Sequence, residues 1–363
     1  MDFSFLNVIG LMTGTSIDGI DISMVRTNGL ELKRLNQNYY YQYDADTKKK
    51  LMDVLTNDIN QNLENKEFLD EFITNEHYKA LKDLGIVEKC DLIGFHGQTI
   101  YHNAKSKTSI QLGNPKLLSK LLKKNVIFDF RSNDISLGGQ GAPLAPIYHK
   151  FIIEKLRLKL PACIINIGGV ANLTYWDGKK LLGFDTGPGN ALMDDYSMNV
   201  FKKNFDYNGN IASKGSPINE EVRNFLQQDY FKKSPPKSLD KYSFLKPYKK
   251  LTLKKYSEYD VMATLLEFTS ESIIISLDRL PKKIKSIMIT GGGHRNHYLM
   301  KNLQGKLNLK IFNEQKSKID FDFLESELIA YLSARSIYKL PFTFPSTTGI
   351  SKPLSGGCLY EFL

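Results

Sequence analysis

Two strand–turn–strand patterns constrain the fold of this chain most strongly, because each encloses a glycine-rich turn and each lies in a different half of the sequence. The first occupies residues 5–25, and its second strand alternates Ile20, Ile22 and Met24 with polar positions, as expected of a strand with one buried face. The second occupies residues 162–176. Matching hairpins in the two halves predict a duplicated βββαβα core, which is an α/β fold of two lobes with a cleft between them.

The length of the chain agrees with two lobes, since 363 residues exceed what one hydrophobic core usually holds. We expect an N-terminal lobe at residues 1–158 and a C-terminal lobe at residues 159–326. The last segment, 327–363, is expected to pack back on the N-terminal lobe. Residues 199–255 are rich in Lys, Asn, Tyr and Pro, and we interpret them as an insertion that forms either part of a lid or a plain surface excursion.

A carboxylate follows the apolar run at residues 181–184, where Asp185 begins the sequence Asp-Thr-Gly-Pro-Gly-Asn. Gly187 and Gly189 bracket Pro188, so the backbone can turn sharply and approach a ligand closely. Strand ends in α/β proteins present catalytic groups in this way. Asp185 is therefore our candidate for a general base, although an isolated Asp-Thr-Gly is also the sequence of an ordinary turn.

The turn of the first hairpin offers backbone and hydroxyl donors in a concave loop, an arrangement that binds phosphate oxygens. It lacks the Gly-Lys-Ser/Thr of a Walker loop, which excludes that lysine-assisted type of phosphate binding; a decorated hairpin without a ligand is the alternative. A third glycine cluster follows the strand-like run at residues 287–290, and its small residues would let a flat ring lie against the backbone. The candidate nucleotide-binding residues are Gly14, Thr15, Ser16, Ile17, Asp18, Gly19, Ile20, Asp21, Asn166, Gly168, Gly169, Gly291, Gly292 and Gly293.

Six motifs stand in an order that is typical of one enzyme family. They are GTSIDGID at residues 14–21, HGQT at 96–99, GGQGAP at 138–143, NIGGVAN at 166–172, DTGPGN at 185–190 and GGG at 291–293. With these motifs the chain resembles the anhydro-N-acetylmuramic acid kinases over nearly its whole length, down to residues 345–349. That family is part of the sugar kinase, heat-shock ATPase and actin group. The resemblance therefore implies a duplicated ribonuclease H-like fold, as in actin-like ATPases, whose two hairpins hold the phosphates of ATP.

The resemblance also implies an ATP-dependent kinase acting on an amino sugar whose O6 is locked in an ether to C1. In this family a base takes a proton from water, the water attacks C1, and the released O6 receives the γ-phosphoryl group, giving N-acetylmuramic acid 6-phosphate in cell-wall sugar recycling. Asp185 matches the family's base, and a carboxylate is suited to deprotonating water at an acetal carbon. Two alternatives stay open, namely a kinase of the same group that phosphorylates an ordinary sugar hydroxyl, and a non-catalytic nucleotide-dependent sensor.

Three residues near the middle of the first half are candidates for contacts with the sugar. His96 and Thr99 follow the strand-like run at residues 92–95, and His96 fits either a structural role or a substrate contact. Arg131 suits the lactyl carboxylate of a muramic sugar, because a guanidinium can bind a carboxylate with two parallel hydrogen bonds. An internal pair with Asp134 is the alternative for Arg131.

Glu325 is a further substrate candidate, because the helical pattern that it opens returns to the cleft in the resembling family. Glu325 and Glu327 are also explained by the favourable interaction of acidic residues with the first turn of a helix, which is our preferred interpretation. Family members commonly show an Asp, two residues, and then Glu-Ala. Asp322 and Glu325 match that spacing, but Ser326 replaces the alanine.

Asp18 and Asp21 are the candidate ligands for Mg²⁺, directly or through water, because magnesium keeps several waters and takes few carboxylates. Either residue could instead cap its own turn. Cys90, Cys163 and Cys358 are isolated from one another, and neither they nor the six histidines have metal-binding spacing. We therefore expect ATP and Mg²⁺ as the cofactors, free thiols, and no zinc site.

The net charge of +10 comes mainly from scattered lysines without an array of Arg and aromatic residues, which favours a solvated surface over a nucleic-acid groove. A basic field would still concentrate ATP and an anionic sugar. No apolar run of about 18 residues occurs, and the N-terminus lacks a signal-peptide layout. We therefore expect a cytoplasmic enzyme with a small-molecule substrate and no nucleic-acid or membrane partner, and the resemblance suggests a homodimer.

Overall fold

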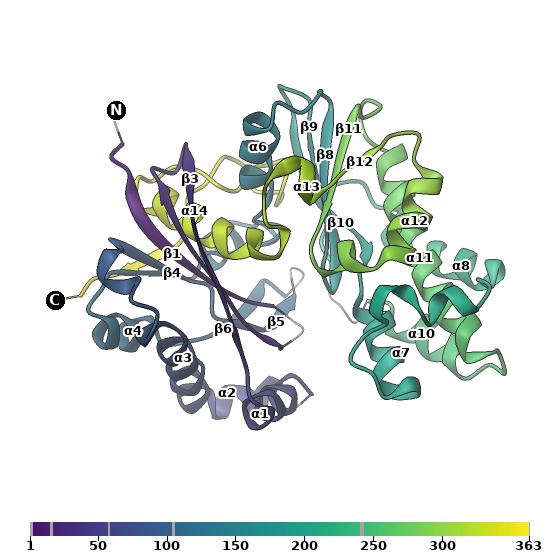
Figure 1. Ribbon diagram of the computed structural model, residues 1–363, viewed down its shortest axis with the longest axis horizontal. Coiled ribbons are helices and arrows are strands. Elements are labelled where there is room, and N and C mark those ends of the chain that lie inside the picture. Colours follow the sequence, from purple (N-terminus) through teal and green to yellow (C-terminus); the bar gives the residue numbers. More distant parts are fainter. Residues whose placement is uncertain (1–2, 15–16, 57–58, 104–105, 240–242, 363) are drawn as a thin grey trace. The chain divides into compact units, whose positions relative to one another are not determined.

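The computed structural model describes residues 3–14, 17–56, 59–103, 106–239 and 243–362. The chain divides into two compact units (Figure 1). Unit 1 comprises Met1–Phe151 together with Asp322–Leu363, and unit 2 comprises Ile152–Phe321. The C-terminal segment therefore belongs to the same unit as the N-terminal strands.

Unit 1 contains a six-stranded sheet in the order β13-β7-β4-β1-β2-β3 and a separate hairpin of β5 and β6. The first three strands form an antiparallel meander, and β4 and β7 continue the sheet in parallel on the other side of β1. The strands of unit 1 are β1 (Leu6–Thr13), β2 (Gly19–Thr27), β3 (Leu32–Gln42), β4 (Leu92–Phe95), β5 (Gln98–Asn103), β6 (Thr108–Leu112), β7 (Val126–Phe128) and β13 (Cys358–Tyr360).

Unit 2 contains a five-stranded sheet in the order β10-β9-β8-β11-β12. Its first three strands again form an antiparallel meander, and its last two again continue in parallel beside the first. The strands are β8 (Ala162–Ile167), β9 (Val170–Trp176), β10 (Leu181–Pro188), β11 (Ser286–Thr290) and β12 (Ile311–Phe312). Five strands thus follow one another in the same spatial order in both units, which confirms the predicted α/β fold with a duplicated core and both predicted hairpins.

Helices complete each unit. In unit 1 they are α1 (Ala45–Thr56), α2 (Ile59–Glu64), α3 (Lys66–Lys82), α4 (Pro115–Leu122), α5 (Ser132–Ser136) and α14 (Leu324–Ile337), while α6 (Pro146–Lys155) crosses the division between the units. In unit 2 they are α7 (Ala191–Phe201), α8 (Asn219–Leu226), α9 (Asp229–Lys232), α10 (Leu245–Thr252), α11 (Glu258–Asp278), α12 (His297–Lys306) and α13 (Glu314–Ser317). Short 3₁₀ turns lie at Val87–Lys89, Tyr207–Gly209, Ala212–Lys214, Gly292–Arg295 and Phe321–Phe323. Within the described residues, no helix combines the length and apolarity needed to cross a membrane.

Helix α14 packs directly against the backbone of the unit 1 sheet, where it contacts β1, β2 and β4. Gly10 of β1 permits this approach, because a Cβ at that position would lie 1.9 Å from the carbonyl oxygen of Ser326. Any larger residue would therefore push the helix away from the sheet. The returning C-terminal segment is thus part of the unit 1 core.

Residues 199–255 are more ordered than their composition indicates. They form α8, α9 and α10, and they bury Phe225, Phe231 and Phe244 in the same core as Phe268 of α11. Three aromatic side chains each bury a large apolar area. The described part of this segment therefore contributes to the hydrophobic core of unit 2.

Candidate functional site

Asp185 lies within β10 and at a bulge, rather than at the end of the strand as we expected. It pairs with Asn172 of β9, whereas Gly187 pairs with Ala171, so that Thr186 is an extra residue in β10. The strand therefore continues beyond Asp185 to Pro188. A bulge changes the direction of the side chains beside it, and this one gives Asp185 an orientation that the regular pleat would not.

A segment that follows α8 holds Asp185 by three hydrogen bonds. The Asp185 amide donates to the carbonyl of Lys237 over 3.0 Å, and the amide of Leu239 donates to Oδ2 of the carboxylate over 2.7 Å. The hydroxyl of Tyr230 donates to the Asp185 carbonyl over 2.5 Å. We call residues 230–239 the clamp segment, because they hold both the backbone and the carboxylate of Asp185, which is only 7% exposed.

The glycine turn between β8 and β9 is bonded to the chain that follows Asp185. The amide of Gly189 donates to the carbonyl of Gly169 over 2.9 Å, and the amide of Asn190 donates to the carbonyl of Gly168 over 2.8 Å. These bonds connect the two glycines of the turn with the start of α7. Unit 2 therefore places the predicted turn of the second hairpin beside the Asp-Thr-Gly-Pro-Gly motif.

The predicted cluster at residues 291–293 reaches the same part of unit 2. Thr290 donates from its hydroxyl to Oδ1 of Asn166 over 3.2 Å. Gly291 has a φ of 76°, and a Cβ there would lie 2.5 Å from Asn166 Oδ1, so only glycine suits this position. Asn166, Gly168, Gly169 and the glycine cluster thus lie together, as a single nucleotide-binding surface would require.

In unit 1, the tip of the first hairpin is closed by polar contacts on the described side of the turn. Asp18 forms an ion pair of 2.6 Å with Lys48, and its carbonyl accepts the amide of Tyr43. Ile17 and Ile20 are buried beneath the turn, and Ile17 is bonded back to Gly14 over 3.4 Å. Two predicted nucleotide-binding residues of this turn, Thr15 and Ser16, lie outside the described residues.

The two candidate magnesium ligands lie near a common tyrosine. Partial burial, Asp18 and Asp21 together raise the pKa of Tyr40 to about 12, which indicates that both carboxylates act on its hydroxyl. Hard carboxylate oxygens suit Mg²⁺, so the donor chemistry fits the ion. Among the described residues, no group of three or more His, Cys, Asp or Glu side chains gathers as a metal site.

His96 and Arg131 form a connected pair in unit 1. The Nδ1 of His96 bonds to the carbonyl of Gly97 over 2.9 Å, and its Nε2 lies 3.1 Å from Nη2 of Arg131. The carbonyl can only accept, so Nδ1 carries the proton and Nε2 accepts from the guanidinium. Burial, with the charge of Arg131, lowers the pKa of His96 to about 3. A neutral imidazole therefore positions the arginine.

Arg131 is also held by the loop that follows α5, because its Nη1 donates to the carbonyl of Gly141 over 2.7 Å. That loop is bonded to Asp134, which accepts the amide of Gly141 and the hydroxyl of Thr348, each over 2.7 Å. Thr99 lies on β5, and its hydroxyl oxygen is 3.3 Å from Nε2 of Gln111 on β6. Unit 1 thus brings Arg131 and His96 together, while Thr99 stands on the β5–β6 hairpin.

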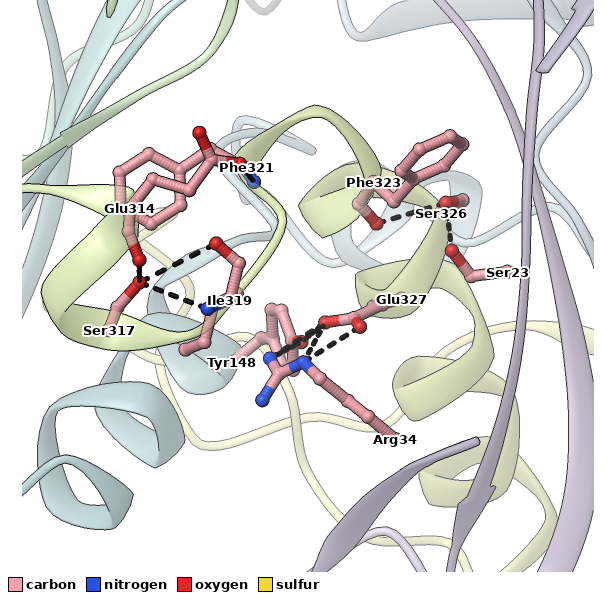
Figure 2. A network of polar contacts seen from close by, with 10 residues as sticks. All are labelled: Ser23, Arg34, Tyr148, Glu314, Ser317, Ile319, Phe321, Phe323, Ser326 and Glu327. Atoms are coloured by element: carbon pink, nitrogen blue, oxygen red, sulfur yellow. Dashed lines mark hydrogen bonds and ion pairs between the residues drawn. The ribbon is translucent and has the colours of Figure 1, made fainter. Parts of the chain in front are cut away.

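Figure 2 shows a buried charge network in unit 1 that the sequence analysis missed. Glu327 of α14 accepts hydrogen bonds from Arg34, from Nε over 2.8 and 3.0 Å to its two oxygens and from Nη2 over 2.7 Å, and a further short one from the hydroxyl of Tyr148. The Glu327 side chain is 2% exposed. We attributed Glu327 to the helix dipole, but it is a buried ion-pair partner. Its spacing from Leu324, Leu328 and Tyr331 puts it on an apolar helical face, which is the signal that could have indicated burial.

Glu325 and Ser326, which precede Glu327 on α14, take no part in its ion pair with Arg34. Glu325 is half-buried in the first turn of the helix. Ser326 occupies the position where we expected an alanine, and its hydroxyl lies 2.7 Å from that of Ser23 on β2 and donates to the carbonyl of Phe323. Figure 2 shows these contacts at the start of the helix. The departure from the expected pattern therefore connects α14 to the sheet.

Comparisons with known proteins give a consistent result. A family model described as anhydro-N-acetylmuramic acid kinase matches residues 6–362. The chain is 37% identical to the anhydro-N-acetylmuramic acid kinase of Pelagibacter ubique (strain HTCC1062), covering 98% of this chain and 99% of that protein. It is 36% identical to the enzyme of the same name from Agrobacterium fabrum (strain C58 / ATCC 33970), covering 97% of each.

Solved structures resemble the chain more distantly. A chain of the PilM–PilN type IV pilus biogenesis complex is 13% identical, with a TM-score of 0.45 over 91% of this chain and 99% of that one. Component A of the Acidaminococcus fermentans (R)-2-hydroxyglutaryl-CoA dehydratase is 11% identical, with a TM-score of 0.44 over 91% of this chain and 99% of that one.

Proposed function

Because the chain belongs to the anhydro-N-acetylmuramic acid kinase family, we propose that it opens 1,6-anhydro-N-acetylmuramic acid with water and phosphorylates the released O6 with ATP. The product is N-acetylmuramic acid 6-phosphate, an intermediate of cell-wall sugar recycling. The match of the family model from residue 6 to residue 362 carries this proposal. Relatives between 31% and 37% identical over nearly the full length bear the same name.

Asp185 is the general base in this proposal. Its carboxylate takes a proton from a water molecule, the water oxygen attacks C1 of the sugar, and the C1–O6 bond breaks. O6 then forms its bond to the γ-phosphorus of ATP as the bond to ADP breaks. The amide of Leu239 bonds to one carboxylate oxygen, which limits the orientations in which the other oxygen can meet the water. A positioned base of this kind typically contributes about 10²- to 10⁴-fold to the rate.

Residues of unit 1 recognise the sugar. Arg131 binds the lactyl carboxylate, and the neutral His96 that accepts its Nη2 hydrogen bond fixes the direction of the guanidinium. His96 therefore acts on the substrate through Arg131 as a positioning residue. Thr99 and Glu325 are further proposed contacts to the sugar hydroxyl and amide groups.

ATP is the second substrate, and the glycine-rich turns are its proposed contacts. In unit 2 the proposed contacts are Asn166, Gly168, Gly169 and the backbone at 291–293, which the structure gathers in one place. In unit 1 they are the residues at 14–21. Asp18 and Asp21 would hold Mg²⁺, which neutralises phosphate charge when it is bound. Lys48, which pairs with Asp18, would share that carboxylate with the ion.

A single assay separates this reaction from phosphorylation of an ordinary hydroxyl. ATP consumption is measured with anhydro-N-acetylmuramic acid, with N-acetylmuramic acid, and without sugar. The proposal requires stoichiometric 6-phosphate only from the anhydro sugar. In water enriched with oxygen-18, the product must carry one labelled oxygen at C1. Equal turnover of N-acetylmuramic acid, or an unlabelled C1, would contradict the proposal.

The remaining properties are proposed on the same basis. We place the enzyme in the cytoplasm as a homodimer, acting on small molecules without a nucleic-acid or membrane partner. Sedimentation velocity at micromolar concentration tests the dimer, which predicts about twice the 41.4 kDa mass of the chain. Retention on heparin that disappears at modest salt is expected from the lysine-rich surface, and tight, length-dependent DNA binding would contradict it.

A further inference from the structure

A basic pocket lies in unit 2 beside the strand that carries Asp185. Its volume is about 220 Å³, and its lining includes Phe184 of β10, the side chains of Lys232, Lys233 and Lys237, and Arg279 with Ser276 on the other side. Four cationic side chains therefore converge on one small space. Asp229 pairs with one of them, Lys232, over 2.8 Å.

Lys237 is the most buried of these cationic residues, since only 7% of its surface is exposed. Its ammonium lies 4.4 Å from the ring centroid of Tyr230 and about 6 Å from those of Phe184 and Phe231. Aromatic faces attract a cation, but they replace water and its hydrogen bonds only in part. Burial, followed by the nearby Arg279, lowers the pKa of Lys237 to about 8. The nearby Asp185 carboxylate acts in the opposite direction, and the Lys237 ammonium donates to the carbonyl of Tyr230 over 3.4 Å, but the pKa stays below its usual value. A further anion would therefore stabilise the buried ammonium beside these cations.

We propose that this pocket binds a phosphate group, held by Lys233, Lys237 and Arg279. Nη1 of Arg279 donates to the carbonyl of Phe231. The other N–H groups of the guanidinium can donate to phosphate oxygens, and the ammonium groups add compact charge. Ser276 lies on the same lining, where its hydroxyl donates to the carbonyl of Ser272 over 2.8 Å. The phosphate belongs either to the inorganic ion or to a sugar phosphate such as the product of the proposed reaction. The site is formed by unit 2 and is separate from the nucleotide-binding turns at 168–169 and 291–293.

The pocket is connected to Asp185 through the clamp segment. Lys237 contributes its side chain to the pocket and its carbonyl to the Asp185 amide. Two residues later, Leu239 donates to the Asp185 carboxylate. Phosphate in the pocket would therefore restrain the residues that orient the base. This connection rests on the proposed function, whereas phosphate binding itself does not.

Binding of inorganic phosphate to the full chain tests the site by calorimetry. The protein is saturated with Mg²⁺ and a non-hydrolysable ATP analogue, so that phosphate cannot enter the nucleotide positions. Lys233→Ala removes an exposed cation of the pocket, and Lys237→Met removes the buried charge but keeps the length of the side chain. Each variant should bind phosphate about tenfold more weakly or worse, because a hydrogen bond to a charged group is lost.

A matched control is Lys301→Ala, which removes an exposed lysine of α12 in the same unit and outside the pocket. It should bind phosphate as the wild type does. Unchanged emission from Trp176, the single tryptophan of the chain, verifies that unit 2 stays folded in each variant. Absence of phosphate binding in the wild type, or equal binding in all three variants, would overturn the proposal.

Repeating the titration with N-acetylmuramic acid 6-phosphate identifies the source of the phosphate. A larger loss on Lys233→Ala for the sugar phosphate than for the inorganic ion indicates the product, and a loss for the inorganic ion alone indicates free phosphate. Hydrogen exchange provides the second readout, since phosphate should slow exchange across residues 230–239. These measurements do not depend on turnover, so they succeed or fail independently of the proposed kinase reaction.

Discussion

The third strand of each meander, β3 in unit 1 and β10 in unit 2, occupies the same place in the sheet order but meets different surroundings. Every residue of β10 is buried, whereas every residue of β3 after Leu32 is half-buried or exposed. Both strands carry a bulge next to a charged residue. In β3 the register shifts after Arg34, where Asn36 has a φ of 55°, and in β10 it shifts at Asp185.

The two charges are held in different ways. Arg34 is paired with a buried carboxylate and a tyrosine hydroxyl. These contacts join β3, which carries Arg34, to α6 and α14. The carboxylate of Asp185 is oriented by an amide of the clamp segment, which lies between α7 and α11 in the chain. The comparison shows that a bulge in the third strand places a charged residue in both units: Arg34 joins elements of unit 1, whereas Asp185 is the base only in the proposed reaction.

Replacing Asp185 with Asn should produce the largest effect on activity. We expect kcat to fall by about 10²- to 10⁴-fold, because the amide cannot accept the proton of water. Asparagine keeps an oxygen for the Leu239 amide, so folding and ATP affinity should remain. Steady-state kinetics and nucleotide titration measure the two properties. Activity close to that of the wild type would break the comparison, since Asp185 would then be as structural as Arg34.

Replacing Glu327 with Ala should destabilise unit 1 by about 3 kcal/mol, because Arg34 would lose its buried partner. Replacing both Arg34 and Glu327 with Leu should cost less than the single change, since no uncompensated charge remains. Urea denaturation followed by ellipticity measures the loss. Trp176 lies in unit 2, and its emission gives a separate signal for that unit. A loss below about 0.5 kcal/mol would mean that the pair behaves as a surface ion pair.

Mild acid should distinguish the two units through buried histidines. Burial lowers the pKa of His77 to about 4 and that of His149 to about 3, and His96 is similarly lowered to about 3. All three belong to unit 1. The unfolded chain takes up protons first, near pH 6.5, so stability is complete above that pH and falls as the pH drops toward the folded values.

The expected loss is about 1 kcal/mol for each histidine per pH unit below 6.5. Between pH 6.5 and 4.5, hydrogen exchange should therefore accelerate in unit 1 before Trp176 emission changes. A His149→Gln variant, which cannot take up a proton, should show a smaller dependence on pH. If hydrogen exchange in unit 1 and Trp176 emission changed together at every pH, the two units would not differ in their stability to acid.

Replacing Tyr230 with Phe should have the smallest effect. The change removes the hydroxyl that donates to the Asp185 carbonyl but keeps the aromatic ring beside Lys237. One neutral hydrogen bond is worth about 0.5–1.5 kcal/mol, so kcat should fall by about three- to tenfold while KM for ATP stays the same. A decrease in kcat as large as that of Asp185→Asn would contradict this expectation. The clamp segment would then do more for Asp185 than orient its carboxylate.

The elements that the sequence predicted well are those with a local signal. Glycine-rich turns between alternating apolar residues indicated both hairpins, and their repetition indicated the duplicated core. The apolar run before Asp185 placed that residue on the correct strand. Residues 291–293 were correctly placed between a strand and a helix, because strand, glycine and helix patterns follow one another there without interruption.

The parts that could not be predicted depend on contacts between distant residues. Arg34 meets Glu327 and Tyr148 only after the C-terminal helix has returned to the sheet. The contact of His96 with Arg131 also joins two separate loops. The contacts of the clamp segment could not be predicted, because the lysines and prolines around it obscure the aromatic residues that anchor it. The bulge at Asp185 leaves no trace in apolar periodicity, since every residue of β10 is buried.

The close approach of α14 to Gly10 also has a consequence for the order of folding on the ribosome. The first strands of unit 1 leave the exit tunnel early, but the helix that covers them is synthesised only after all of unit 2, at residues 152–321. At 5–20 residues per second, this interval lasts on the order of ten seconds. During that time the nascent N-terminal sheet offers an uncovered apolar face, which is the form of the chain that a molecular chaperone would recognise.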